Sequence, residues 1–418
     1  MTQTPPPPPA VGSSDRRALA VLFAIVFINL VGFGLVVPLL PFFGRSLNAE
    51  AWQVALMFSA YSLGQFFAEP FWGRLSDRIG RKPVLLITVI ANALGYLMLA
   101  YAPNIWVAIG IRLFTGLGAG NVSTVQGYVA DVTPPEKRAG RMGLIGAAFG
   151  AGFVAGPALS GLLVREDLGA LGYQLPIFAA CGLATLAALG VVFLLKESLV
   201  RQAGPPTARP AFLSGVRDAA TNPVVSRVIL VTLIYMAGFS GMESTFGLWA
   251  GARYDWGARE VAFAFMTVGI VSVICQSAVT GRLSRRFGES RMLSVGCLMF
   301  GCGLIGQVLA PAAWFLPVAM SVGAFGMAMT MPNISAMISR ATPPDRQGAM
   351  LGLNMAASSS GRIFGPVVAG AMFSSLGHDW PLAVGALLMI PAALMAANAG
   401  RAVKRGNSVS VMDPHTAA

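Results

Sequence analysis

The sequence predicts an all-α membrane protein in which twelve transmembrane helices form two six-helix bundles. Of its 418 residues, 55% are hydrophobic and only 11% are charged, whereas soluble domains carry about 25% charged residues. Uncharged stretches at residues 18–44 and 292–339 exceed the roughly 20 residues that a membrane-spanning helix needs. The segment GRLSDRIGRK at 73–82 returns as GRLSRRFGES at 281–290, which indicates two related halves.

Apolar runs between charged or proline-containing breaks give the elements in chain order. Each run is long enough to cross a bilayer as a helix. Residues 133–136 and 156–161 also recur, at 342–345 and 365–370, so both halves place their loops alike. The expected spans are 18–43, 52–72, 83–102, 105–129, 141–164, 174–195, 226–250, 260–281, 291–310, 314–338, 347–375 and 380–400.

The spans divide into two bundles joined by a polar linker that is rich in arginine and proline. A proline-rich segment precedes the first span and is expected to be disordered. The expected organisation is a disordered tail at 1–17, a first bundle at 18–196, a cytoplasmic linker at 197–225, a second bundle at 226–400 and a cytoplasmic tail at 401–418.

The basic residues predict the orientation in the membrane. With the N-terminus inside, 23 of the 29 Lys and Arg residues fall in cytoplasmic segments and four fall in outer loops. This is the positive-inside pattern, and it places both termini in the cytoplasm of a multi-pass inner-membrane protein. The net charge of +12 therefore reflects topology, and nucleic acid is not expected as a partner.

The segment 73–82 has more structure than topology requires. Its glycines fit a sharp turn at the cytoplasmic face, and Asp77 can offer its carboxylate to the positive end of a neighbouring helix. Asp131, at the inner end of span 4, lies within reach of the arginines of this segment. A merely basic inner loop is the alternative to a cytoplasmic gate. The gate residues would be Gly73, Asp77, Arg78, Gly80, Arg81 and Asp131.

Three other patterns lie inside spans. In span 4, Arg112 is followed by Thr115 and a glycine pair. In span 5, small residues four positions apart allow close helix packing, and a proline adds a kink. In span 1, Asn29 precedes a run of spaced glycines and prolines. The span 5 pattern comprises Gly143, Gly152, Gly156, Pro157 and Gly161.

Together these motifs resemble those of the major facilitator superfamily, and within it the drug–proton antiporters that include the tetracycline efflux proteins. The resemblance covers nearly all of residues 18–400. It implies that Asp77 contacts helix 11, that Arg112 serves proton transfer or tunes a nearby acid, and that the span 5 motif serves export by exchange. One departure is clear, because Asn29 replaces an aspartate of the tetracycline efflux proteins, and spans 3 and 9 contain no acid.

The acids bear on proton coupling. Glu243 is the only carboxylate well inside a span, and burial favours the protonated form of a carboxylate. We expect it to bind a proton or a cationic substrate together with Arg112; a carboxylate locked to an arginine is the alternative. Glu69 is expected to be a solvated acid near the inner surface. Candidate cavity residues are Asn29, Tyr61, Gln65, Asn121, Tyr235, Phe246, Asn333 and Arg362.

The predicted function is secondary active transport by alternating access, with export of a small, largely apolar compound, neutral or cationic, in exchange for protons. The alternatives are proton-coupled uptake of a sugar, osmolyte or organic anion, and a non-transporting sensor. The sequence has no GxxxxGK[ST] phosphate loop, and no span contains His or Lys, so neither an ATPase nor an intramembrane enzyme is expected. We expect no cofactor or metal; the partners are the small-molecule substrate, protons and the lipid bilayer, and the protein would function as a monomer.

Overall fold

The computed structural model describes residues 13–199, 212–343 and 346–411. These residues contain helices and connecting turns and no strand. In the first half the elements are α1 (Ser13–Val36), η1 (Val37–Leu39), α2 (Leu40–Ser46), α3 (Ala51–Ile79), α4 (Arg81–Ala100), α5 (Ile105–Ala119), α6 (Val122–Asp131), α7 (Pro135–Leu163), η2 (Glu166–Leu168) and α8 (Ala170–Phe193). In the second half they are α9 (Phe212–Thr221), α10 (Pro223–Tyr254), α11 (Ala258–Ile274), η3 (Cys275–Thr280), α12 (Gly281–Phe287), α13 (Glu289–Val308), η4 (Ala313–Phe315), α14 (Leu316–Arg340), α15 (Gln347–Ser375) and α16 (Trp380–Val411).

Every predicted span coincides with one of these helices or with a continuous run of them, so the all-α membrane fold is confirmed. Within the described residues, ten segments are long and apolar enough to cross a membrane. The two remaining predicted spans coincide with α3 and α15, which are more polar and pack against each other. Helices inside a bundle can carry polar residues where they face a cavity and not lipid.

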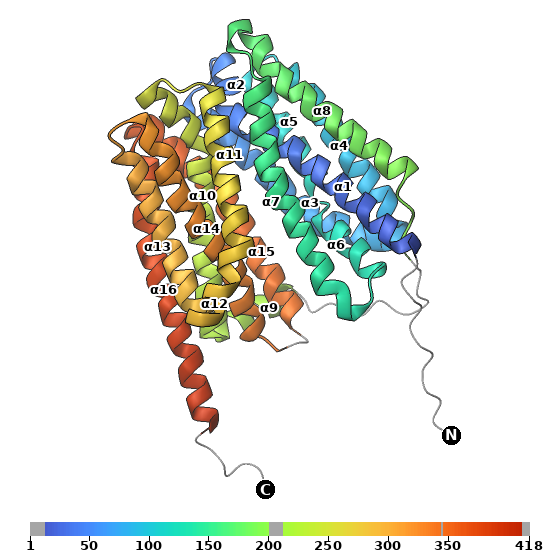
Figure 1. Ribbon diagram of the computed structural model, residues 1–418, viewed down its shortest axis with the longest axis vertical. Coiled ribbons are helices and arrows are strands. Elements are labelled where there is room, and N and C mark those ends of the chain that lie inside the picture. Colours follow the sequence, from blue (N-terminus) through green and yellow to red (C-terminus); the bar gives the residue numbers. More distant parts are fainter. Residues whose placement is uncertain (1–12, 200–211, 344–345, 412–418) are drawn as a thin grey trace.

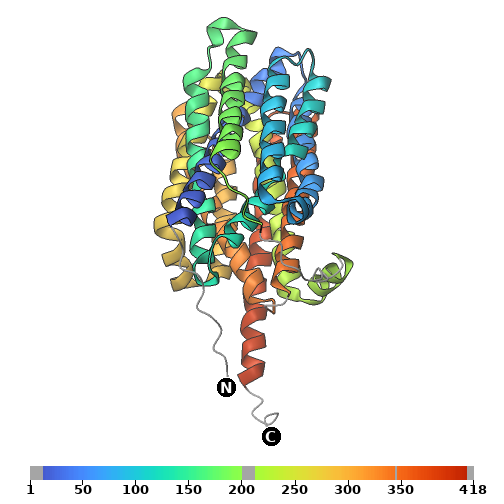
Figure 2. The same cartoon turned by 90° about the vertical axis from the view of Figure 1, so that its right-hand side faces the viewer.

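The helices form two groups, α1–α8 and α10–α16, that stand side by side (Figure 1). Equivalent helices make equivalent contacts, because α1 packs on α7 as α10 packs on α15, and α4 packs on α8 as α13 packs on α16. The first residue of α1 and the last of α16 lie at the same end of the molecule, and α9 lies across that end (Figure 2). We call this the terminal end.

Some boundaries differ from the prediction. Helix α1 begins at Ser13, inside the range predicted to be disordered, and α16 continues to Val411 through most of the predicted tail. The predicted linker contains α9, and α10 begins at Pro223 because the Asn222 side chain caps it by accepting hydrogen bonds from two backbone N–H groups of the first turn. Residues 1–12 and 412–418, and 200–211 within the linker, lie outside the described residues.

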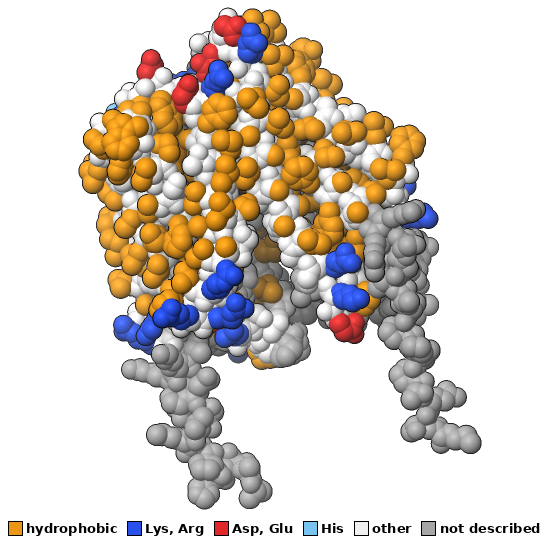
Figure 3. All heavy atoms as spheres, in the orientation of Figure 1, with side chains coloured by type: hydrophobic (Ala, Val, Ile, Leu, Met, Phe, Trp, Pro, Cys, Tyr) orange, Lys and Arg blue, Asp and Glu red, His pale blue; other side chains and the backbone are white. Residues whose placement is uncertain are grey.

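The two halves touch at the end opposite the terminal end. There Arg45 Nη2 donates to the carbonyl oxygen of Leu248 (3.4 Å). A carboxylate oxygen of Glu166 accepts from the backbone N–H of Ala258 (2.8 Å) at the first turn of α11, where the helix dipole favours a negative charge. Toward the terminal end the surface is hollowed between the halves (Figure 3).

Candidate functional site

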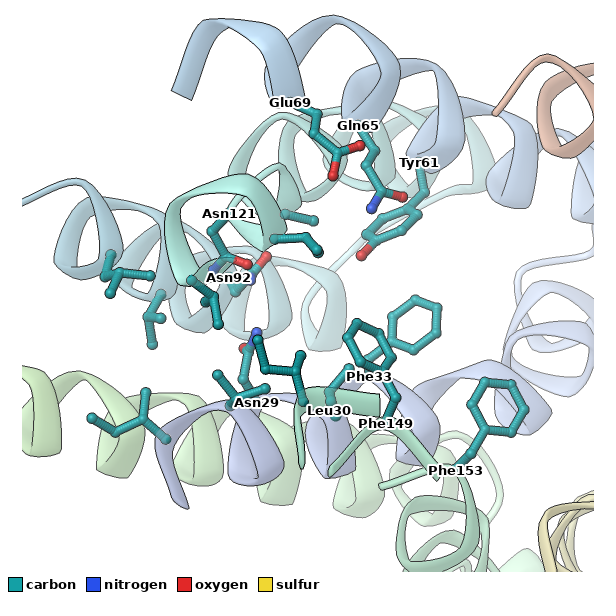
Figure 4. Close-up of a pocket in the computed structure, with 18 of the residues that line it drawn as sticks. Asn29, Leu30, Phe33, Tyr61, Gln65, Glu69, Asn92, Asn121, Phe149 and Phe153 are labelled. Carbon is teal, nitrogen blue, oxygen red and sulfur yellow. The ribbon is translucent and has the colours of Figure 1, made fainter. Parts of the chain in front are cut away.

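A cavity of about 380 Å³ lies between the halves, on the side of the terminal end. Most of its wall comes from the first half, from α1 and α3–α7, and α15 closes it from the second half. Both apolar and polar side chains line it (Figure 4). The lining therefore suits a compound that is mostly apolar and carries a few polar groups.

Five predicted cavity residues do line this space. They are Asn29, Tyr61, Gln65, Asn121 and Arg362. Asn29 and Asn121 approach from opposite sides (Figure 4), and Asn121 Nδ2 also donates to Thr88 Oγ1 (3.1 Å).

The other three predicted cavity residues lie elsewhere, which corrects the prediction. Tyr235 packs on Phe300 within the second half, with ring centroids 5.0 Å apart. Phe246 belongs to a buried aromatic cluster of the same half. Asn333 is buried and donates to a backbone carbonyl one turn earlier in its own helix. A span has several faces, and these side chains project from faces turned away from the cavity.

The polar cavity residues that sequence analysis missed include Asn92 and Glu69. Glu69 was expected at a solvated surface, but α3 continues for ten residues beyond it, so its half-buried side chain faces the cavity. A signal was available, because Tyr61, Gln65 and Glu69 are four residues apart and therefore share one face of a helix. Figure 4 shows them in a row along α3.

A group of charged side chains lies behind the cavity. Glu243 of α10 is only 3% exposed, and its Oε2 lies 3.7 Å from Nη2 of Arg362 on α15. Arg112 of α5, in the other half, is 2% exposed. These three residues line one void of about 10 Å³, close to the smallest space that holds a water molecule.

Arg112 is held by an aromatic ring. Its guanidinium carbon lies 4.3 Å from the ring centroid of Tyr61, a cation–π distance. Among the described residues, neither Arg112 Nε nor Glu243 Oε1 has a hydrogen-bond partner. The two predicted coupling residues, which come from different halves, are thus brought together with Arg362 around one buried void. The alternative, a carboxylate locked to an arginine, is met only by the 3.7 Å pair between Glu243 and Arg362.

Comparison with known proteins places this arrangement in a family. The family model described as Major Facilitator Superfamily matches residues 22–313 and 277–410. The chain belongs to the major facilitator superfamily. It is therefore a multi-pass membrane transporter of small molecules and not an enzyme.

Relatives of this transporter include drug-resistance proteins. It is 31% identical to the class C tetracycline resistance protein of Escherichia coli, over 88% of this chain and 92% of that protein. It is 27% identical to multidrug resistance protein 2 of Bacillus subtilis (strain 168), over 90% and 94%.

Solved structures show the same fold at lower identity. The crystal structure of the human organic anion transporter MFSD10 (TETRAN) matches with a TM-score of 0.69 and 23% identity, over 93% of this chain and 100% of that one. A bacterial homolog to the human lysosomal transporter Spinster, inward-facing and occupied, matches with a TM-score of 0.78 and 15% identity, over 92% and 96%.

In this transporter the segment 73–82 is mostly helical, which corrects the expected turn. Helix α3 runs through Gly73, whose missing side chain admits Ser123. The chain turns at Gly80, where φ is +111°, a conformation that favours glycine. The carboxylate of Glu197 accepts from the backbone N–H groups of Arg81 (2.9 Å) and Lys82 (3.1 Å), and so caps α4.

Hydrogen bonding sets the charge state of this cap. Partial burial acts to raise the pKa of Glu197, but the hydrogen bonds that its carboxylate accepts from backbone N–H groups outweigh burial and lower the pKa below its ordinary value. These donors are the backbone N–H groups of Leu199, Arg81, Lys82 and Ser198.

Arg81 is the centre of a polar network on the same end. Its Nη1 lies 2.7 Å from Asp77 Oδ1, and its Nε donates to Asp131 Oδ2 (3.1 Å). The expected contact between Arg81 and Asp131 is therefore present. Arg78 is exposed and has no ion pair among the described residues, so the prediction that it reaches Asp131 is not met.

The second copy of this segment keeps the geometry and reverses the charges. Gly288 has φ +86° and separates α12 from α13, as Gly80 separates α3 from α4. Glu289 stands where the first copy has Arg81, and it pairs with Arg340, the counterpart of Asp131, at 2.9 Å. The same helix ends are therefore joined by an ion pair of opposite polarity in each half.

The span 5 glycines allow α7 to pack closely on two helices. A Cβ at Gly156 would lie 2.6–2.8 Å from backbone atoms of α1, and one at Gly152 would lie 2.7 Å from Leu30 Cβ. Gly161 faces Phe263 of α11 in the other half. Gly143 is exposed with open space around it. Pro157 lies inside α7, and its ring is close to the backbone of α1.

No metal site was expected. Within the described residues, no group of three or more His, Cys, Asp or Glu side chains could hold a metal ion.

Proposed function

We propose that this transporter exports a small, largely apolar compound in exchange for protons. The observation that carries the proposal is Glu243, a buried carboxylate that shares one void with Arg362 of its own half and Arg112 of the other. The drug-resistance relatives support export. The mixed apolar and polar lining of the cavity supports a largely apolar substrate.

Protonation of Glu243 would change the balance of forces between the halves. The ionised carboxylate attracts both arginines, and at 3.7 Å the attraction to Arg362 is about 4 kcal/mol at an effective dielectric constant of 20. The protonated form leaves two positive charges facing each other. One proton moving inward supplies about 2.3 kcal/mol per 100 mV and about 1.4 kcal/mol per pH unit. The free energy from one proton is therefore similar in size to the attraction between Glu243 and Arg362.

The orientation is part of the proposal. The terminal end would face the cytoplasm of a bacterial inner membrane, because the basic residues gather there (Figure 3). The cavity would then open inward and the contacts of Glu166 and Arg45 would close the outer side. The bundles 18–196 and 226–400 would rock about the void as a monomer.

The polar network around Arg81 would form part of the cytoplasmic gate. When the terminal end closes, the parts of α15 and α3 at that end would approach each other, and Asp77 would meet the first turn of α15, where a helix favours a negative charge. Asp77 would then divide its charge between Arg81 and α15. The span 5 glycines would keep α7 close to α1 and α11 during this movement.

Transport by purified protein in proteoliposomes tests the proposal. Vesicles are loaded with a fluorescent drug, and the side that corresponds to the periplasm is acidified. Proton exchange predicts that the drug moves toward the acidic side against its gradient. Movement away from the acidic side would support uptake by symport, and no movement under any gradient would contradict transport.

A further inference from the structure

We propose that Glu69 binds the positive charge of a cationic substrate, at a site separate from the proton site at Glu243. The inference rests on the proposed function and names the substrate class, an organic monocation with apolar rings. Glu69 would then bind the substrate, and Glu243 would bind the proton.

The first argument is that Glu69 is unpaired. Its carboxylate makes no ion pair or hydrogen bond with any described residue, and its half-buried side chain lines the cavity. Among the described lining residues Glu69 is the one acid and Arg362 is the one base. Arg362 already has Glu243 beside it, so the charge left without a partner in the cavity wall is the negative charge of Glu69.

The second argument is the surface around this carboxylate. Gln65 lies one turn along the same face of α3 and supplies a polar amide, and Tyr61 lies one turn further. Phe149 and Phe153 of α7 line the opposite wall. Aromatic faces attract cations and pack against apolar rings. A compound with one positive charge and aromatic rings can pair its charge with the Glu69 carboxylate and pack its rings against these phenylalanines.

The third argument is the wall between the two acids. Phe33, Tyr61 and Arg362 line both the cavity and the small void that holds Glu243. The void offers about 10 Å³, which excludes anything much larger than water. A substrate cation therefore meets Glu69 in the cavity, whereas a proton can reach Glu243.

Equilibrium binding to the purified, full-length protein in lipid nanodiscs tests the inference. The probes are radiolabelled tetraphenylphosphonium, a permanent monocation, and tetraphenylborate, an anion of the same shape. Glu69→Gln should weaken tetraphenylphosphonium binding about tenfold, the equivalent of about 1.4 kcal/mol, because the neutral amide removes the negative charge that attracts the cation. Tetraphenylborate binding should stay unchanged or strengthen, and Glu69→Asp should restore most of the cation affinity.

Glu136→Gln is the matched control, because Glu136 is exposed at the same end and lies outside the cavity lining; it should leave both affinities unchanged. Equal loss of both probes in Glu69→Gln, an unchanged cation affinity, or no saturable cation binding by the wild type would overturn the inference. Proton-driven export of a neutral compound should persist in Glu136→Gln. Its absence in the wild type would overturn the proposed function, which separates the two failures.

Discussion

The contact between α1 and α7 gives a steric prediction with an internal control. In Gly156→Ala the new Cβ would lie 2.6 Å from the carbonyl carbon and 2.7 Å from the Cα of Gly34, and 2.8 Å from the backbone nitrogen of Leu35. Carbon atoms pack at about 3.5–4.0 Å, so the helices must separate by roughly 1 Å. Overpacking of this kind costs about 1–3 kcal/mol, which exceeds the gain of up to about 1 kcal/mol from replacing glycine by alanine in a helix.

Gly143→Ala is the control, because it lies in the same helix and the same motif but has nothing within 4 Å of its added Cβ. Gly143→Ala should therefore be stabilised by the higher helix propensity of alanine and should not pay the steric cost. Thermal unfolding in detergent can be monitored by size-exclusion chromatography after heating. The melting temperature should be lowered by a few degrees for Gly156→Ala and unchanged or raised for Gly143→Ala. Equal destabilisation by both substitutions would refute the packing argument.

Two further predictions concern the terminal end. Asp77→Asn should slow transport in proteoliposomes by about 2- to 30-fold, the equivalent of a helix-dipole contact of about 0.3–2 kcal/mol, whereas Arg285→Asn in the second copy should change it little; equal effects would contradict an asymmetric gate. Glu197→Gln should lower stability at neutral pH by about 0.5–1 kcal/mol through loss of the cap. Because the folded pKa is depressed, this difference should be present above the ordinary Glu value of 4.5 and should vanish as the pH falls through the folded value; melting curves at several pH values measure it, and a difference that persists in acid would argue against the cap.

The sequence was sufficient for the fold because hydropathy and charge act on whole spans. Each apolar run forms a helix, and the repeat of segment 73–82 at 281–290 indicates that the second half is related to the first. The sequence misplaces Glu69 because the glycines of 73–82 predict a turn there, and such a turn would end α3 too early. Once α3 is continued to Ile79, the spacing of Tyr61, Gln65 and Glu69 puts all three on one face.

Two other features could not be predicted from the sequence and are evident only in the three-dimensional structure. Tyr235 and Phe246 share a span with Glu243, but the rotation of α10 about its axis decides which side chain meets the other half, and hydropathy is nearly uniform around that helix. The pair of Glu289 and Arg340 could not be found by aligning the two halves. At both positions the residue differs from its counterpart in the first half, so an alignment scores two mismatches where an ion pair has been kept with its charges exchanged. Only the spatial pairing shows that the interaction was kept.

The most direct test of the account is Glu243→Gln in proteoliposomes. If Glu243 carries the coupled proton, the variant should lose drug accumulation driven by a pH gradient and should keep exchange of drug for drug at equal pH, as measured by counterflow. Glu136→Gln, which removes an exposed acid outside the cavity lining, is the control and should keep both activities. Gradient-driven accumulation by Glu243→Gln at the wild-type level would contradict the central claim.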